Sequence, residues 1–265
     1  MAKAMLRREF LGLGCAVGGF CLGHGVEAAA GQPGTPAAAT FPWAYRPLDV
    51  ARVKARAYNG YFKGGCMYGV FEAVAGSVAD TLGKPSTDFP FEVTSYGAGG
   101  VAGWGTLCGT CNGAAMAIAL FYQGELRTRL INDVFSWYEG ATLPTYVPGQ
   151  PVKVPNTFSM PSSRSDSLLC HASIARWAAA SHLSSSSPER LERCARLAAD
   201  VAGHLAEALN AAQGEYTPRT SIRGVAAGCL SCHADKKEVP TEAQIVGRMA
   251  CTSCHRDAHN QKKFE

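Results

Sequence analysis

Apolar residues recur at helical spacing through most of this chain, and no stretch alternates apolar and polar residues strongly enough to predict a β-sheet. The clearest helix begins at Pro188-Glu189 and ends at about Gln213, where Gly214 stops it. Its apolar face consists of Leu191, Ala195, Ala198, Ala202, Leu205 and Leu209. This face predicts a long helix packed against other helices.

Further segments with helical character precede that helix. They cover residues 48–61, residues 65–82, a segment from about Asn112 with Ala115, Met116, Ile118, Ala119 and Phe121 on it, residues 126–138, and a segment from Ser165-Asp166 to His182. Residues 86–111 are rich in Gly, Ser and Thr and predict a loop, and prolines mark the connection after Tyr138. The pattern predicts a mainly α protein, with a helical body over residues 31–214 and a short region over residues 215–265.

That C-terminal region holds two similar pentapeptides, Cys229-Leu-Ser-Cys232-His233 and Cys251-Thr-Ser-Cys254-His255. Each has the C-x-x-C-H form of covalent c-type haem attachment, in which two thiols bond the haem and the His is the proximal iron ligand. A four-cysteine zinc ribbon uses a similar spacing, but zinc does not require a His after both second cysteines. The repeated His therefore favours two haem c groups, with His233 and His255 as proximal ligands.

The N-terminal residues 1–30 have the form of an export signal. Arg7-Arg8 precede Phe10-Leu11 and a weakly apolar Gly-rich stretch, and Ala28-Ala29-Ala30 fits a cleavage site before Gly31. The paired arginines resemble a twin-arginine signal, and an ordinary secretory signal is the alternative. Either export route leads to the periplasm, so we expect a periplasmic protein. The apolar run is too short to cross a bilayer, so we expect no membrane span after signal removal.

The net charge of the chain limits the classes of molecule that it is expected to bind. The formal net charge is only +4, and the basic residues are dispersed, which argues against nucleic acid as a partner. Lys236-Lys237 and Lys262-Lys263 lie near the haem motifs and could steer an acidic redox partner, although a solvated surface explains them as well.

Two haems on so short a region need cover for their apolar faces. The helical body, the other haem or a second subunit must shield these faces from water. We therefore expect the two haem rings to contact each other and the protein to form a homodimer. Each iron also needs a sixth ligand unless it is catalytic. The available imidazoles are His171, His182, His204 and His259, and the thioether alternatives are Met67, Met116, Met160 and Met249. Bis-imidazole coordination is favoured, and the eleven-residue spacing predicts that His171 and His182 share a helix face.

Of the chain's 11 cysteines, two lie in the export signal and four in the haem motifs. The others are Cys66, Cys108, Cys111, Cys170 and Cys194, an odd number that cannot all form disulfides. Three interpretations stay open. An iron–sulfur cluster would use Cys66, Cys108, Cys111 and either Cys170 or Cys194, a Cys108–Cys111 disulfide or dithiol would suit the periplasm, and inert buried thiols are the third possibility.

Several of these segments together resemble the split-Soret cytochromes c. They are Gly64–Ala73, Tyr96–Cys111, Leu169-Cys170-His171-Ala-Ser and Met249–His255, and the resemblance extends over nearly the whole chain after residue 30. It implies a mostly helical periplasmic homodimer with two stacked haems per subunit, bis-His irons with one ligand lent across the dimer, and an iron–sulfur centre on N-terminal cysteines. His171 is then the first candidate for a distal ligand and His259 the second.

These features predict a dihaem c-type cytochrome that carries electrons to and from redox partner proteins. The alternative is a small-molecule reductase in which one haem iron is five-coordinate. A zinc-binding interaction module is the third possibility, and it predicts a colourless protein.

Overall fold

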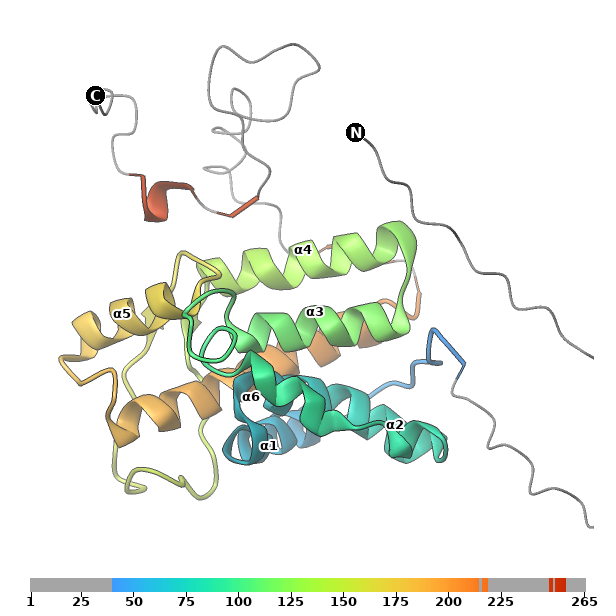
Figure 1. The fold of residues 1–265 in the computed structure, drawn as a ribbon, viewed down its shortest axis with the longest axis horizontal. Coiled ribbons are helices and arrows are strands. Elements are labelled where there is room, and N and C mark those ends of the chain that lie inside the picture. Colours follow the sequence, from blue (N-terminus) through green and yellow to red (C-terminus); the bar gives the residue numbers. More distant parts are fainter. Residues whose placement is uncertain (1–39, 215, 219–247, 250, 256–265) are drawn as a thin grey trace, which may run out of the picture. The chain divides into compact units, whose positions relative to one another are not determined.

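Six α-helices and one two-stranded ladder form the part of the chain that the computed structural model describes (Figure 1). That part is residues 40–214, 216–218, 248–249 and 251–255. The helices are α1 (Val50–Phe71), α2 (Ser77–Leu82), α3 (Gly109–Phe121), α4 (Gly124–Gly140), α5 (Cys170–Ser181) and α6 (Pro188–Ala211), and the strands are β1 (Thr142–Leu143) and β2 (Ser163–Arg164). The mainly α prediction is confirmed. The predicted export signal lies outside the described residues, which all belong to the unit Ala37–Glu265.

The first helix is broken at Gly65, where the helical prediction also changes from one segment to the next. Its φ of 83° and ψ of −172° are non-helical and favour glycine. The two parts of α1 approach each other so closely that a Cβ on Gly60 would lie 3.0 Å from Gly69 Cα. A π-helical segment, Glu72–Gly76, joins α1 to α2, which ends at Gly83 as predicted.

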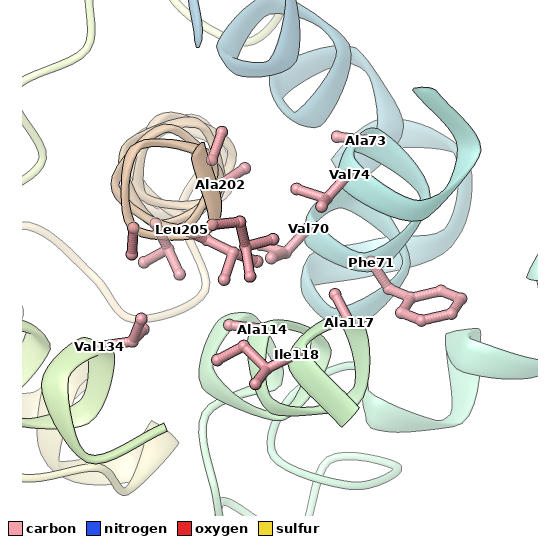
Figure 2. Close-up of a cluster of buried hydrophobic side chains, with 14 of the residues drawn as sticks. Val70, Phe71, Ala73, Val74, Ala114, Ala117, Ile118, Val134, Ala202 and Leu205 are labelled. Carbon is pink, nitrogen blue, oxygen red and sulfur yellow. The ribbon is translucent and has the colours of Figure 1, made fainter. Parts of the chain in front are cut away.

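Small apolar side chains let the helices approach closely in the core. Figure 2 shows Val70 and Val74 facing Ala202 and Leu205 of α6, with Ala114 and Ile118 of α3 beside them. The predicted stripe of α6 is buried from Ala195 to Leu209, and only Leu191 is partly exposed. Burial of this area of apolar surface is the main force that holds α6 against α1 and α3.

Two predicted helix boundaries are wrong. The helix predicted from Ser165-Asp166 begins only at Cys170, because Ser165 and Ser167 form a tight turn and Asp166 has a φ of 44°. That helix ends at Ser181, and His182 is its left-handed C-cap with a φ of 58°. His182 therefore leaves the helical path, and the prediction that it shares a helix face with His171 is wrong.

The buried charges of α6 hold the proline-containing connection in place. The Glu192 carboxylate accepts hydrogen bonds from the Tyr58 hydroxyl, from the Arg196 guanidinium at 2.9 Å, and from the backbone amide of Lys153 at 3.1 Å. Farther along the helix, Asp200 accepts hydrogen bonds from the amide and hydroxyl groups of Thr145. The side chains of Glu192, Arg196 and Asp200 are buried, and each has hydrogen-bond partners.

Candidate functional site

Five cysteines of the helical body gather where the glycine-rich loop meets α3, α5 and α6. Cys66 lies just after the break in α1, Cys108 is the N-cap of α3, and Cys111 is in its first turn. Cys170 opens α5, and Cys194 lies near the start of α6. Four of the thiols are buried, and Cys194 is partly exposed.

A short antiparallel pairing of backbone segments positions Cys108 beside Cys170. Leu107 bridges Leu169, the Cys108 amide donates to the Leu168 carbonyl at 2.8 Å, and the Cys170 amide donates to the Thr106 carbonyl at 2.7 Å. Two segments that are distant in the sequence therefore present their cysteines at one place.

Glycines around the thiols leave no room for a side chain. A Cβ on Gly109 would lie 2.3 Å from Cys66 Sγ, and one on Gly100 would lie 2.8 Å from the Cys170 Cβ. Gly100 also has a φ of 69°, which an L side chain rarely adopts. The loop over residues 86–111 was predicted to allow close approach of its backbone to other groups. In the structure, its glycines lie directly against the cysteine side chains.

The thiols influence one another electrostatically. Burial raises the pKa of Cys66 and of Cys170 to about 12, and the charges of Cys108 and Cys194 act in the same direction on both. A hydrogen bond from Cys111 lowers the pKa of Cys108, and burial raises that of Cys111. The raised pKa values keep Cys66, Cys111 and Cys170 protonated in the absence of a cation, whereas the lowered pKa of Cys108 favours its thiolate.

One buried cation does lie beside them. Arg193 of α6 is 2% exposed, donates to the Ser173 hydroxyl at 2.9 Å, and directs another nitrogen toward Cys194 Sγ at 4.0 Å. Ser173 also accepts a hydrogen bond from Tyr138 at 3.1 Å, and Tyr138 lies close enough to Cys108 to lower the pKa of that thiol. Burial alone would lower the pKa of Arg193, but Cys194, Tyr138 and Cys108 raise it.

The sequence predictions did not include Arg193, Ser173 or Tyr138. The available signal was the position of Arg193, directly before Cys194 in a helix otherwise rich in alanine. Periodicity identifies the buried face of a helix but not the chemistry on the neighbouring helix that a buried charge meets.

The thiols are not arranged as a site for a single metal ion. Among the described residues, no group of three or more His, Cys, Asp or Glu side chains is placed to hold one ion. Cys108 and Cys111 are free thiols and form no disulfide in this structure, and this state agrees with the dithiol form of the predicted disulfide-or-dithiol alternative. The donor set nevertheless fits an iron–sulfur cluster, which spreads its cysteine ligands over several atoms.

The three imidazoles of the helical body differ in their surroundings. His171 is exposed, and its Nδ1 lies 3.1 Å from the Gly105 carbonyl, which leaves Nε2 available. His182 is an exposed C-cap residue. The partly buried His204 stacks on Trp137 with ring centroids 4.0 Å apart. His171 therefore has the geometry most typical of a metal ligand.

His171 also borders a cavity of about 500 Å³ that reaches the thiol centre. Its lining includes Cys170, Gly99, Gly105, Ile174 and Arg190. The cavity thus adjoins both a candidate haem ligand and a candidate cluster ligand.

The second haem motif is the part of the C-terminal region that can be described. Cys251–Ser253 forms a turn of 3-10 helix, and residues three apart in such a turn project to one side. The amides of Cys254 and His255 donate to the Cys251 carbonyl, so the turn brings the two cysteines close together, and His255 is exposed. Cys229, Cys232, His233 and His259 lie outside the described residues.

A cavity of about 340 Å³ adjoins Arg248 and Met249, which precede this motif. Ile131 and Phe135 of α4, Leu168 and Met249 form its apolar part, and polar residues that include Glu139 and Arg248 line the rest. Met249 also accepts a hydrogen bond from Ser167 at 3.7 Å, which attaches the segment before Cys251 to the body. The chain therefore offers apolar cover next to a pair of thiols.

Comparison with known proteins identifies the family. A family model described as a putative redox-active protein (C_GCAxxG_C_C) matches residues 68–208. The chain is also 36% identical over 274 residues to the split-Soret cytochrome c of Desulfovibrio desulfuricans (strain ATCC 27774 / DSM 6949 / MB), a match covering 97% of each protein. The chain belongs to the split-Soret cytochrome c family.

A solved structure extends this relationship to the fold. It is described as "A novel iron centre in the split-Soret cytochrome c from Desulfovibrio desulfuricans ATCC 27774", has a TM-score of 0.74 and 36% identity, and the match covers 84% of this chain and 94% of that one. The predicted resemblance to split-Soret cytochromes c and the mainly α fold are therefore confirmed. Membership of this family also supports a redox role for the chain.

Proposed function

We propose that this split-Soret cytochrome c family member is a periplasmic electron carrier with two haem c groups and an iron–sulfur centre. The gathering of Cys66, Cys108, Cys111 and Cys170 in a buried, glycine-lined site is the observation that carries the proposal. The description of the solved relative as a cytochrome with an iron centre supports it. When bound, these groups accept and release single electrons.

The iron–sulfur centre would be held by Cys66, Cys108, Cys111 and Cys170. All four thiols are buried, whereas Cys194 is partly exposed and contacts Arg193. Burial by the body would exclude water from the bound centre, and the first amides of α3 would direct their positive ends toward its sulfur atoms. In this assignment Cys194 is a neighbour of the centre, not a ligand.

The haems would be bonded through Cys229 and Cys232 and through Cys251 and Cys254, with His233 and His255 as proximal ligands. The turn at Cys251 and the cavity beside Met249 support the second of these sites. His171 would be the distal ligand of one haem, since the Gly105 carbonyl orients its ring and the ring is exposed. His259 would be the distal candidate for the other.

The exposed position of His171 suits a ligand lent to a second subunit, so we propose a homodimer whose haems meet at the interface. Residues 1–30 would be the export signal, residues 31–214 the helical body and residues 215–265 the dihaem region. Among the described residues, no helix is long and apolar enough to span a membrane.

Elemental and spectroscopic analysis of the protein from its own host tests this function. The expected results are more than two iron atoms per chain, acid-labile sulfide, and low-spin signals from both haems. Two iron atoms without sulfide would remove the iron–sulfur centre. A high-spin haem that shifts on ligand addition would favour the small-molecule reductase, and a colourless protein would favour the zinc module.

The distal assignment is tested with His171→Ala, with His182→Ala as the matched exposed control. Loss of the imidazole should turn one haem high-spin, whereas the control should keep both haems low-spin. An unchanged low-spin spectrum in His171→Ala would exclude this residue as a ligand.

A further inference from the structure

A buried arginine without a carboxylate partner borders the thiol centre. Arg193 is 2% exposed, and its Nε has no hydrogen-bond partner. Among the described residues, no carboxylate lies within ion-pair distance of its guanidinium. Its one close oxygen partner is the uncharged Ser173 hydroxyl.

Such an arrangement is costly unless a negative charge is near. Removing a charged group from water costs several kcal/mol even after relaxation, and a neutral hydroxyl does not compensate for it. The other buried arginine of α6 shows the usual solution, because Arg196 pairs with Glu192 at 2.9 Å. Arg193 needs an equivalent anion.

The groups that face Arg193 identify this anion. They are Cys194 of α6 itself, Cys108 of α3, Tyr138 of α4 and Ser173 of α5. Tyr138 is deeply buried, and burial keeps its phenol protonated because it raises the pKa well above the usual value. Of the two cysteines in this set, only Cys108 is a proposed ligand, so Cys108 is the group on which metal binding would place a lasting negative charge.

We propose that Arg193 supplies the fixed positive charge that balances the anionic thiolate centre and makes its reduction easier. This inference rests on the proposed iron–sulfur centre and assigns a charge-balancing residue to it. An electron that enters the centre adds one negative charge. A guanidinium held nearby in a region of low dielectric stabilises the reduced form more than the oxidised form.

Arg193 reaches the centre through a fixed geometry. Ser173 accepts hydrogen bonds from both Arg193 and Tyr138, so one hydroxyl positions a cation and a phenol that both border Cys108. Helices α4, α5 and α6 each supply one residue of this group. The charge is thus preorganised and does not need to move when the electron arrives.

The test compares the full-length, haem-loaded wild type with Arg193→Met and Arg193→Lys. Arg52→Met is the matched control, since the Arg52 side chain is 90% exposed on α1 and its loss changes net charge equally. A mediated redox titration followed by electron paramagnetic resonance gives the midpoint potential of the non-haem centre. Haem content and thermal unfolding confirm that each variant is folded.

We expect the one-electron reduction constant to fall by about tenfold or more in Arg193→Met, a midpoint about 59 mV lower. Arg193→Lys and Arg52→Met should stay close to the wild type. An unchanged potential in Arg193→Met overturns the proposal, and so does an equal fall in Arg193→Lys, since the positive charge would then not be the cause.

Loss of the centre in Arg193→Met but not in Arg193→Lys would support the charge role, whereas loss in both would overturn it. If Arg193→Met does not fold, Arg193→Gln takes its place in the comparison with Arg193→Lys. Wild-type protein without labile sulfide removes the iron–sulfur centre and this proposal together. That outcome is measured before any variant is made, so the two failures are distinguishable.

Discussion

Two groups of buried charge lie on neighbouring faces of α6, and they differ in how completely they are paired. On one side, Glu192 and Arg196 pair with each other, and Glu192 also binds Tyr58 and the Lys153 amide. On the other side, Arg193 contacts thiols and a shared hydroxyl but, among the described residues, no carboxylate. The first group is balanced within the folded chain, whereas we propose that a bound anionic centre balances the second.

This difference separates a structural role from a functional one. A fully paired network fixes the connection after β1 against α6, because breaking any part leaves a buried charge alone. A buried guanidinium whose Nε has no hydrogen-bond partner is unusual in a folded protein, and it motivates the proposed charge-balancing role of Arg193. Both arise within one turn of a single helix, so local sequence alone does not distinguish them.

The largest expected effect is on the satisfied side. Glu192→Ala would strand the Arg196 charge and remove the acceptor for Tyr58 and Lys153, so we expect a loss of about 3–5 kcal/mol of unfolding free energy. Urea denaturation measures it, and Glu192→Gln should lose less. The folded fraction should keep the midpoint potential of the non-haem centre. A potential shift as large as that of Arg193→Met would contradict the separation of the two groups.

A smaller effect is expected where the thiols are packed. Gly109→Ala would place a Cβ 2.3 Å from Cys66 Sγ and 2.6 Å from the Gly97 carbonyl, which must displace the thiol. We expect a cost of about 1–3 kcal/mol and a marked loss of labile sulfide per chain. Gly140→Ala is the control, because a Cβ there has open space. Full sulfide content in Gly109→Ala would show that Cys66 is not a ligand.

The smallest effect is expected at the start of α6. The Ser187 side chain accepts a hydrogen bond from the Arg190 amide at 3.3 Å, and Ser187→Ala should cost about 1 kcal/mol. Thermal unfolding measures this loss, with the exposed Ser185→Ala as control. Because the cap lies outside both charge groups, the midpoint potential should not change. A change would mean that the position of Arg193 depends on the cap.

The sequence predicted the helices well and their terminal turns poorly. The stripe from Ala195 to Leu209 is buried as expected, and Gly83 ends α2. The start of α5 was placed too early because Asp166, which resembles a helix cap, takes a left-handed turn held by Ser165 and Ser167. Such turns depend on local hydrogen bonds that helical periodicity does not describe.

By itself the sequence determined the helical class, the two C-x-x-C-H motifs and the set of spare thiols, because periodicity and short spacings are properties of neighbouring residues. Only the tertiary structure decided that Cys108 lies beside Cys170, that the Gly105 carbonyl orients His171, and that Arg193 borders the thiol site with no carboxylate partner among the described residues. These relations join helices that are distant in the chain. The packing of the helices determines these relations. For Arg193, the free-energy cost of burying an unbalanced charge is the reason to infer a function.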